Sequence, residues 1–325
     1  MRRGESGLSL VVGVDKPTGM TSHDVVSRVR RVFGEKRVGH AGTLDPLASG
    51  VLAVCVGPAP RLDALLTGHD KSYEVRVAFG AATDTDDAEG QVIRTAPVPD
   101  ELADPFAAAS FVASLVGRHR QLPPVYSAIK VGGRKACDEA RKGRIIELEP
   151  RDIEIYDARL IGVNGADGSE PLSWDVALRV SKGTYVRSIA RDMGNALDCP
   201  AHVAALRRTE AGALTLEDCV SLEVLEEVGL RFAYAEGPLA RAVANGNVLE
   251  AGSLCLCERR TCGAGAEFCA CTAGVRESCQ PPRDGELVSI VADNRLAAVY
   301  EYESARERFR PRCVFSTGVI RGSDI

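Results

Sequence analysis

The stretch GHAGTLDPLASG, residues 39–50, runs directly into the apolar segment VLAVCVG, residues 51–57. Glycine lets the backbone adopt conformations closed to other residues and approach a ligand closely. Pro46 restricts the residue before it, Asp45, to an extended or turn conformation. We therefore expect a buried strand over 51–57, preceded by a rigid loop that presents the carboxylate of Asp45 and the imidazole of His40. An ordinary turn is the alternative, because clusters of Gly, Asp and Pro usually mark turns.

The order of the glycines excludes a phosphate-binding loop of the GxxxxGK[ST] type. The whole string GHAGTLDPLASGVL instead resembles the catalytic motif of the TruB family of RNA pseudouridine synthases. This resemblance implies that Asp45 is the catalytic carboxylate. It also implies that the neighbouring residues His40, Gly42 and Thr43 contact the RNA. In that family, the histidine that corresponds to His40 packs into the RNA where the target base was.

Two further segments resemble motifs that complete the catalytic set of the same family. DKSYE, residues 70–74, resembles the segment that carries the active-site tyrosine, which falls on Tyr73. SKGTYVR, residues 181–187, resembles the segment that supplies the arginine partner of the catalytic aspartate, which falls on Arg187. A guanidinium beside Asp45 would keep that carboxyl ionised and oriented. A tyrosine offers a flat face for stacking on uracil and a hydroxyl for proton transfer. Judged from the local sequence alone, Tyr73 is typical of a residue in a core strand, and Arg187 is typical of a residue on a helix surface.

The thumb loop with which the family grips RNA corresponds to residues 121–150, which begin QLPPVYSAIK. ALRRT, residues 205–209, resembles another family motif at the edge of the sheet, and DKPTG, residues 15–19, resembles one near the active site. These segments and the arginine motif imply further RNA-binding residues. They are Lys16, Lys130, Tyr185, Arg207 and Arg208. For Tyr185, packing in the core is an alternative almost as well supported as contact with the RNA.

The periodicity of apolar residues predicts a mixture of helices and strands. Alternation favours strands over 72–80 and 174–180. A helix is expected after Thr21, because Asp24 stands at capping-box spacing from it. The elements do not alternate regularly as βαβ units, which favours an α+β fold with a largely antiparallel mixed sheet flanked by helices.

The 325 residues are enough for two domains, and the pattern changes near residue 235. We expect a pseudouridine synthase catalytic domain over 1–235 and a small, mostly β domain over 236–325 that weakly resembles PUA-like RNA-binding domains. A cysteine-rich insertion interrupts the second domain at 255–283. Its Cys-x-Cys pairs suggest zinc, although C-x₂-C spacing is more typical of zinc ribbons, and incidental thiols are the alternative. The zinc candidates are Cys255, Cys257, Cys269 and Cys271.

Composition bounds the class of protein. No run approaches the roughly 18 apolar residues of a membrane span, and the net charge of −5 excludes a uniformly basic surface. The apolar run at 8–14 is short and meets Asp15, so it predicts a first strand and not a signal peptide, which indicates a cytoplasmic protein. Segments 16–37, 130–144 and 179–191 are basic, and form either solvated helix faces or phosphate contacts.

The resemblance implies an enzyme that converts uridine to pseudouridine in the T-arm of tRNA, at position 55, without a cofactor. The target base would first be flipped out of the folded RNA, and Asp45 would then act as nucleophile or as base. A monomer without an obligatory protein partner is expected. The alternatives are an RNA-folding chaperone, a guide-RNA-dependent synthase and a metal-sensing regulator. The acidic run at 83–90 lacks the ligand pattern of a calcium loop and is expected to be structural.

Overall fold

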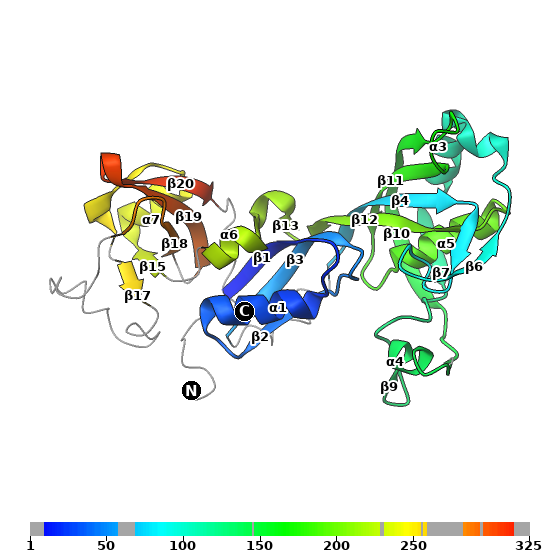
Figure 1. Cartoon of the computed structure of the whole chain (residues 1–325), viewed down its shortest axis with the longest axis horizontal. Coiled ribbons are helices and arrows are strands. Elements are labelled where there is room, and N and C mark those ends of the chain that lie inside the picture. The colour runs from blue at the N-terminus through cyan, green and yellow to red at the C-terminus, as the bar shows by residue number, and fades with distance from the viewer. Residues whose placement is uncertain are drawn as a thin grey trace. The chain divides into compact units, whose positions relative to one another are not determined.

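The computed structural model describes residues 10–57, 69–144, 146–227, 231–254, 256–258, 282–292 and 295–314. The chain divides into two compact units. One comprises residues 1–46, 50–67 and 213–325, and the other comprises residues 47–49 and 68–212. Figure 1 shows the elements of both units along the chain. The domain boundary that we expect at 235 does not follow from this division and stays a prediction.

The first unit holds the N-terminal strands, which pair around β1. β1 runs antiparallel to β3 and parallel to β14, and β3 also pairs with β2 in an antiparallel ladder. Helices α1 and α6 contact each other beside these strands. The elements are β1 (Leu10–Lys16), α1 (Ser22–Phe33), β2 (Val38–Ala41), β3 (Ser49–Val56), β13 (Leu214–Thr215), η3 (Leu216–Asp218), β14 (Cys219–Ser221) and α6 (Leu222–Glu227).

The helix predicted after Thr21 is α1, and it begins where the capping-box spacing indicates. Thr21 accepts a hydrogen bond from the Asp24 backbone N–H, while the Asp24 carboxylate accepts one from the Thr21 backbone N–H, which completes the capping box. Gly34 ends the helix in the left-handed conformation, which costs glycine little. The apolar stripe is buried, as its spacing predicts. It consists of Val25, Val26, Val29, Val32 and Phe33.

The second unit is built on five strands in which every neighbouring pair is antiparallel. In order across the sheet they are β12 (Ala201–Ala211), β4 (Lys71–Phe79), β11 (Ser173–Val180), β10 (Arg151–Asn164) and β7 (Gly117–Gln121). Helices α3 (Pro105–Ser114) and α5 (Val186–Ala196) pack on these strands. The predicted α+β class and its largely antiparallel sheet are therefore confirmed. β4 and β11 are the strands predicted over 72–80 and 174–180.

Burial in the second unit follows the alternation of its strands. In β4, Val75, Val77 and Phe79 are buried, whereas Glu74 and Arg76 on the other face are exposed. Trp174 of β11 is almost fully buried. Its ring packs edge-on against Phe79 with centroids 4.8 Å apart, and its indole N–H donates to the Leu102 carbonyl at 2.8 Å. The core therefore lies between the sheet and the helices and leaves the opposite face polar.

Two excursions leave this sheet. One is a ribbon of β5 (Ala81–Thr83) and β6 (Val92–Thr95), joined by the acidic run 83–90, which we call the acidic loop. The chain then passes through η2 (Asp100–Ala103) to α3. The other excursion is the predicted thumb loop, which carries the hairpin β8 (Lys130–Val131) and β9 (Arg134–Lys135) and the helix α4 (Ala136–Ala140). Gly132 and Gly133 both adopt positive φ at the hairpin tip.

The C-terminal part of the first unit is a six-stranded sheet, which confirms the expected mostly β composition. Its buried core includes Val288, Ile290, Tyr300 and Phe309. In order across the sheet the strands are β16 (Leu249–Glu250), β20 (Arg308–Val314), β19 (Arg295–Glu303), β18 (Leu287–Ala292), β15 (Arg231–Ala235) and β17 (Leu256–Glu258). The helical segments are α7 (Gly237–Ala244), η4 (Ala251–Ser253) and η6 (Ser304–Arg306). Throughout the part of the chain that the structure describes, no helix has the length and apolar character needed to cross a membrane.

Candidate active site

The loop that carries Asp45 is shorter than the sequence predicts. Residues 38–41 form β2, so His40 lies in a strand opposite Val54 of β3 and not in the loop. The reason is that the backbone of this segment pairs with β3, a contact that local glycine content does not reveal. The remaining loop, residues 42–48, joins β2 to β3 and contains Asp45.

Both neighbours of Asp45 are held by hydrogen bonds. The buried Ser22 hydroxyl accepts from the Leu44 backbone N–H and donates to the Leu44 carbonyl, each at 2.9 Å. The Pro46 carbonyl accepts from the Gly19 backbone N–H at 2.8 Å. Because hydrogen bonds hold Leu44 and Pro46, the backbone of Asp45 between them has a defined position.

Lys16 supports the same loop from within the unit. Its side chain is fully buried, and Nζ donates to the carbonyls of Pro17, Met20 and Pro46 at 2.8, 2.6 and 3.4 Å. An ammonium group has three hydrogen-bond donors, so these three carbonyls can take all of them. Lys16 therefore organises the loop, and the RNA contact expected for it stays a prediction.

Tyr73 lies in β4, where its side chain is 7% exposed. In the ladder it stands opposite Leu178 of β11 and Arg208 of β12. Arg208 is 1% exposed, so a guanidinium is buried beside the tyrosine. Burial, with the positive charge of Arg208 in second place, lowers the pKa of Lys71 in the same strand to about 8.

Arg187 lies in the first turn of α5 and is almost completely buried. Its guanidinium donates to the Thr85 carbonyl at 2.8 Å and to the Tyr126 carbonyl at 3.0 Å. It also lies 3.5 Å from a carboxylate oxygen of Asp87. These contacts fix the plane of the guanidinium, which is what a partner of a catalytic carboxylate requires.

Asp87 is a partner of the predicted catalytic Arg187 that the sequence does not reveal, because the acidic loop is expected to be structural. Its Oδ1 atom accepts hydrogen bonds from the Thr85 hydroxyl at 2.6 Å and from the Glu89 backbone N–H at 3.1 Å. The other carboxylate oxygen faces Arg187. The available signal was the density of carboxylates in residues 83–90, which contain no basic residue.

The predicted catalytic residues are divided between the two units. Asp45 belongs to the first unit, and Tyr73 and Arg187 belong to the second. The structure brings Arg187 together with Asp87, 100 residues away in the chain. That Asp45 joins Tyr73 and Arg187 in one active site stays a prediction.

Of the remaining RNA-binding candidates, Lys130, Arg207 and Tyr185 lie in the second unit, whereas Gly42 and Thr43 lie in the first. Lys130 is exposed at the base of the thumb hairpin. Arg207 lies opposite Glu74 in the ladder, and its guanidinium donates to the Ser49 hydroxyl at 3.3 Å. Tyr185 is the N-cap residue of α5, and its backbone carbonyl accepts a hydrogen bond from the Ile189 N–H at 3.2 Å. Gly42 adopts a positive φ of 78° directly after β2, followed by Thr43.

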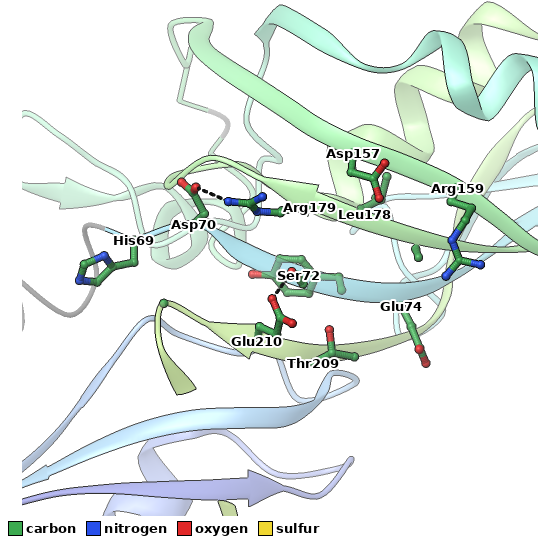
Figure 2. A pocket seen from close by; sticks show the side chains of 13 residues that line it. His69, Asp70, Ser72, Glu74, Asp157, Arg159, Leu178, Arg179, Thr209 and Glu210 are labelled. Carbon is green, nitrogen blue, oxygen red and sulfur yellow. Dashed lines mark hydrogen bonds and ion pairs between the residues drawn. The ribbon is translucent and has the colours of Figure 1, made fainter. Parts of the chain in front are cut away.

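A cavity of about 670 Å³ opens on the polar face of the sheet (Figure 2). Tyr73 is among the residues that line it, together with charged side chains of both signs. Arg179 lies 3.6 Å from Asp70, and the Ser72 hydroxyl donates to Glu210 at 2.7 Å, as the dashed lines in Figure 2 indicate. Only the first of these contacts pairs opposite charges, and the lining holds the carboxylates of Asp70, Glu74, Asp157 and Glu210 against the guanidiniums of Arg159 and Arg179, so the cavity is a polar depression with an excess of acidic side chains.

The zinc candidates cannot be placed as a site. Cys255, Cys269 and Cys271 lie outside the described residues, and Cys257 is described only through its backbone in β17. Among the described residues, no group of three or more His, Cys, Asp or Glu side chains is arranged to hold a metal ion. Zinc binding by the cysteine-rich insertion stays a prediction.

Comparison with known families identifies two matching domain models. Residues 30–186 match the model of the TruB family pseudouridylate synthase N-terminal domain. Residues 187–244 match the model of the tRNA pseudouridylate synthase B C-terminal domain. Together these matches contain Asp45, Tyr73, Asp87 and Arg187.

Individual relatives agree with these models. The tRNA pseudouridine synthase B of Geobacillus kaustophilus (strain HTA426) is 46% identical over 216 residues, which are 66% of this chain and 75% of that protein. The tRNA pseudouridine synthase B of Mycobacterium tuberculosis (strain ATCC 25618 / H37Rv) is 46% identical over 217 residues, 67% of this chain and 72% of that protein.

Two solved structures resemble the chain at low sequence identity. A chain in the crystal structure of the archaeal box H/ACA sRNP Nop10-Cbf5 complex is 20% identical, with a TM-score of 0.48, and the match covers 96% of this chain and 87% of that chain. A chain in a Cbf5-Nop10-Gar1 complex is 21% identical, with a TM-score of 0.49 and coverage of 96% and 86%.

Proposed function

Since the chain belongs to the TruB family of pseudouridylate synthases, we propose that this RNA pseudouridine synthase acts on tRNA and isomerises a uridine of the T-arm, at position 55. The observation that carries the proposal is the family match across residues 30–244, which contains all three predicted catalytic residues. The 46% identity to tRNA pseudouridine synthase B proteins supports tRNA as the substrate.

The reaction begins with extrusion of the target base, which costs a few kcal/mol of unstacking. The exposed basic residues of the thumb loop are suited to hold the RNA backbone while this happens, because lysine and arginine neutralise phosphates. They are Lys130, Arg134, Lys135, Arg141, Lys142 and Arg144. Binding of this kind reads the shape and phosphates of the RNA more than its sequence.

Asp45 then acts on the flipped uridine, either by attack on C1′ or by removal of the C2′ proton. If Asp45 attacks C1′, an ester forms as the N1–C1′ bond breaks, and the ester bond to C1′ breaks in turn when the rotated uracil forms its C5–C1′ bond. If Asp45 removes the C2′ proton, the N1–C1′ bond breaks to leave a C1′–C2′ double bond, and Asp45 returns the proton to C2′ as the C5–C1′ bond forms. In both routes the C5 proton leaves last. Arg187 is assigned to hold Asp45 ionised. Its own plane is set by Thr85, Tyr126 and Asp87, which supports this role. Tyr73 is assigned to stack on the uracil and to accept the C5 proton.

Water must be kept from the detached uracil, or the base and the sugar would be lost to hydrolysis. The side chains of Ser22 and Lys16 hold the Asp45 loop through hydrogen bonds to the backbone of Leu44 and Pro46. We propose that the enzyme works as a monomer in the cytoplasm without a protein partner or cofactor. We also propose that the catalytic domain covers 1–235 and a PUA-like domain covers 236–325.

The test measures tritium release from a T-arm RNA labelled with tritium at uridine C5. Asp45→Asn is expected to abolish release while the dissociation constant for the RNA stays within a factor of about 3, because one neutralised carboxylate removes chemistry and no phosphate contact. Asp100→Asn, an exposed aspartate in η2, is the matched control and should retain full activity. Undiminished release by Asp45→Asn would contradict the catalytic assignment. An Asp45→Asn protein that still promotes tRNA folding would identify a chaperone role besides catalysis.

A further inference from the structure

The first turns of α5 hold the start of the thumb loop through side-chain hydrogen bonds. The Ser188 hydroxyl donates to the Leu122 carbonyl at 2.9 Å. Arg191 donates to the same carbonyl at 2.7 Å. One turn earlier, Arg187 donates to the Tyr126 carbonyl at 3.0 Å. Residues 122–126, which we call the thumb base, are therefore fastened to α5 at two points.

Gln121 fastens the same junction from the side of the sheet. Its amide N–H₂ donates to the Tyr185 carbonyl at 3.0 Å, and its amide oxygen accepts from the Tyr185 backbone N–H at 2.9 Å. The side chain is 3% exposed, so both bonds are shielded from water. The residue that ends β7 thereby fixes the residue that precedes α5.

Arg191 also reaches the acidic loop. Its guanidinium lies 3.1 Å from an Asp86 carboxylate oxygen, and the two side chains are 23% and 16% exposed. The loop is itself anchored to β12, because the Asp86 carbonyl accepts from the Val203 backbone N–H at 3.0 Å and the Ala88 N–H donates to the Val203 carbonyl at 2.9 Å. Asp86 adopts a φ of +62°, an unusual conformation for a residue with a side chain, which indicates a loop held by its surroundings.

Arg187 and Arg191 thus bridge the same two segments, one helical turn apart. Each guanidinium contacts an aspartate of the acidic loop and a carbonyl of the thumb base. Burial raises the pKa of Asp86 despite the opposing charge of Arg191, so this pair is a poor source of stability. A planar guanidinium that binds two partners fixes the position of each partner relative to the other.

We propose that Arg191 is a positioning residue, which holds the thumb base and the acidic loop against α5. Through this connection, binding of RNA by the thumb loop sets the position of the Arg187 guanidinium. The inference rests on the proposed function, because positioning of Arg187 matters for the rate only if the protein isomerises uridine. It assigns to the Asp86–Arg191 pair a role in the rate of the reaction on bound RNA and not in affinity.

The experiment is a double-mutant cycle in the full-length protein between Arg191→Gln and Lys130→Ala in the thumb hairpin. The rate constant for tritium release is measured in a single turnover at saturating T-arm RNA, with the RNA dissociation constant measured separately. Arg191→Gln is expected to slow the bound complex roughly tenfold, since small misplacement of a catalytic group costs rate, while Arg191→Lys recovers part of the loss. In the Arg191→Gln background, Lys130→Ala is expected to slow the reaction less than it does in the wild type, because the coupling is already broken.

Arg94→Gln, in the exposed strand β6, controls for the loss of an arginine charge and should leave the rate unchanged. Equal slowing by Lys130→Ala in both backgrounds, or a wild-type rate for Arg191→Gln, would overturn the inference.

Hydrogen exchange without RNA gives a second readout that does not depend on activity. Faster exchange of the amides of Leu122, Val125 and Tyr126 in Arg191→Gln than in wild type supports the fastening, and equal exchange rules it out; Pro123 and Pro124 have no amide hydrogen. A wild-type protein that binds the RNA and releases no tritium would overturn the proposed function, while the exchange result would still decide the fastening.

Discussion

The Arg187 guanidinium lies 3.5 Å from the Asp87 carboxylate, and the two side chains are only 6% and 5% exposed. A pair buried to this degree gains little net stability, but losing one partner leaves the other charged and unsatisfied. The pair links α5 to the acidic loop, so it connects the helix that carries the predicted catalytic arginine with a segment far away in the sequence.

Asp87→Ala should therefore be strongly destabilising. We expect the free energy of unfolding to fall by about 3–5 kcal/mol, because the buried Arg187 charge loses its counterion. Tritium release should also fall sharply, since the guanidinium is no longer held in place. Urea titration and single-turnover assays measure the two effects. Asp84→Ala is the matched control from the same loop, because its carboxylate is only half-buried and its Oδ1 accepts from the Gln91 backbone N–H. Equal stability losses in the two variants would refute this explanation.

Ser22→Ala tests the support of the Asp45 loop. The substitution leaves the buried N–H and C=O of Leu44 without the hydroxyl that now pairs with both. We expect a loss of about 1–3 kcal/mol in the free energy of unfolding, together with slower release of tritium and unchanged RNA affinity. Ser27→Ala, whose exposed hydroxyl donates only to the His23 carbonyl within α1, should leave both quantities near wild type.

The thumb loop contains an acid-sensitive clamp. Glu139 of α4 accepts from Arg144 at 2.6 Å and from Lys142 at 3.3 Å. The hydrogen bond from Arg144 is the largest cause that lowers the pKa of Glu139 from 4.5 to about 2. Because the pKa in the folded state lies below that of the free side chain, the clamp contributes its full stability above pH 4.5 and loses it as the pH falls through about 2.

NMR titration of the Glu139 carboxyl carbon checks this expectation. A midpoint near 2 is expected in the wild type, and Arg144→Gln should move it upward, because the charged donor is removed. Arg141→Gln is the comparison, since Arg141 pairs with Asp138 in the same helical segment. A wild-type midpoint near the ordinary value of 4.5 would show that the clamp does not form in solution.

Thr21→Ala should affect stability without affecting chemistry. The substitution removes one half of the capping box of α1, which should cost about 1 kcal/mol. Thr21→Ser retains the hydroxyl and should behave like the wild type. Thermal unfolding of the three proteins, with tritium release measured well below the transition, separates the two effects. A rate loss in Thr21→Ala at a temperature where it is fully folded would mean that this cap also orders the Asp45 loop.

Sequence periodicity predicted the elements whose causes are local. The bounds of α1 follow from Asp24 and from the capping residues Thr21 and Gly34, which flank the helix directly, and the buried face of β4 follows from simple alternation. β2 was missed because its formation depends on pairing with β3 and not on its own residues. The partner of Arg187 could not be predicted either, because Asp87 is 100 residues away and nothing in the intervening sequence indicates that the two meet.

By itself, the sequence determined the family, the local elements and the residue types needed for the chemistry, because motif spacing, helix capping and apolar periodicity are written within short segments. The tertiary structure alone decided that two arginines of α5 clasp the acidic loop and the thumb base. It did so because a buried guanidinium must find acceptors for its donors. Which carbonyls and carboxylates meet that need depends on how distant segments pack.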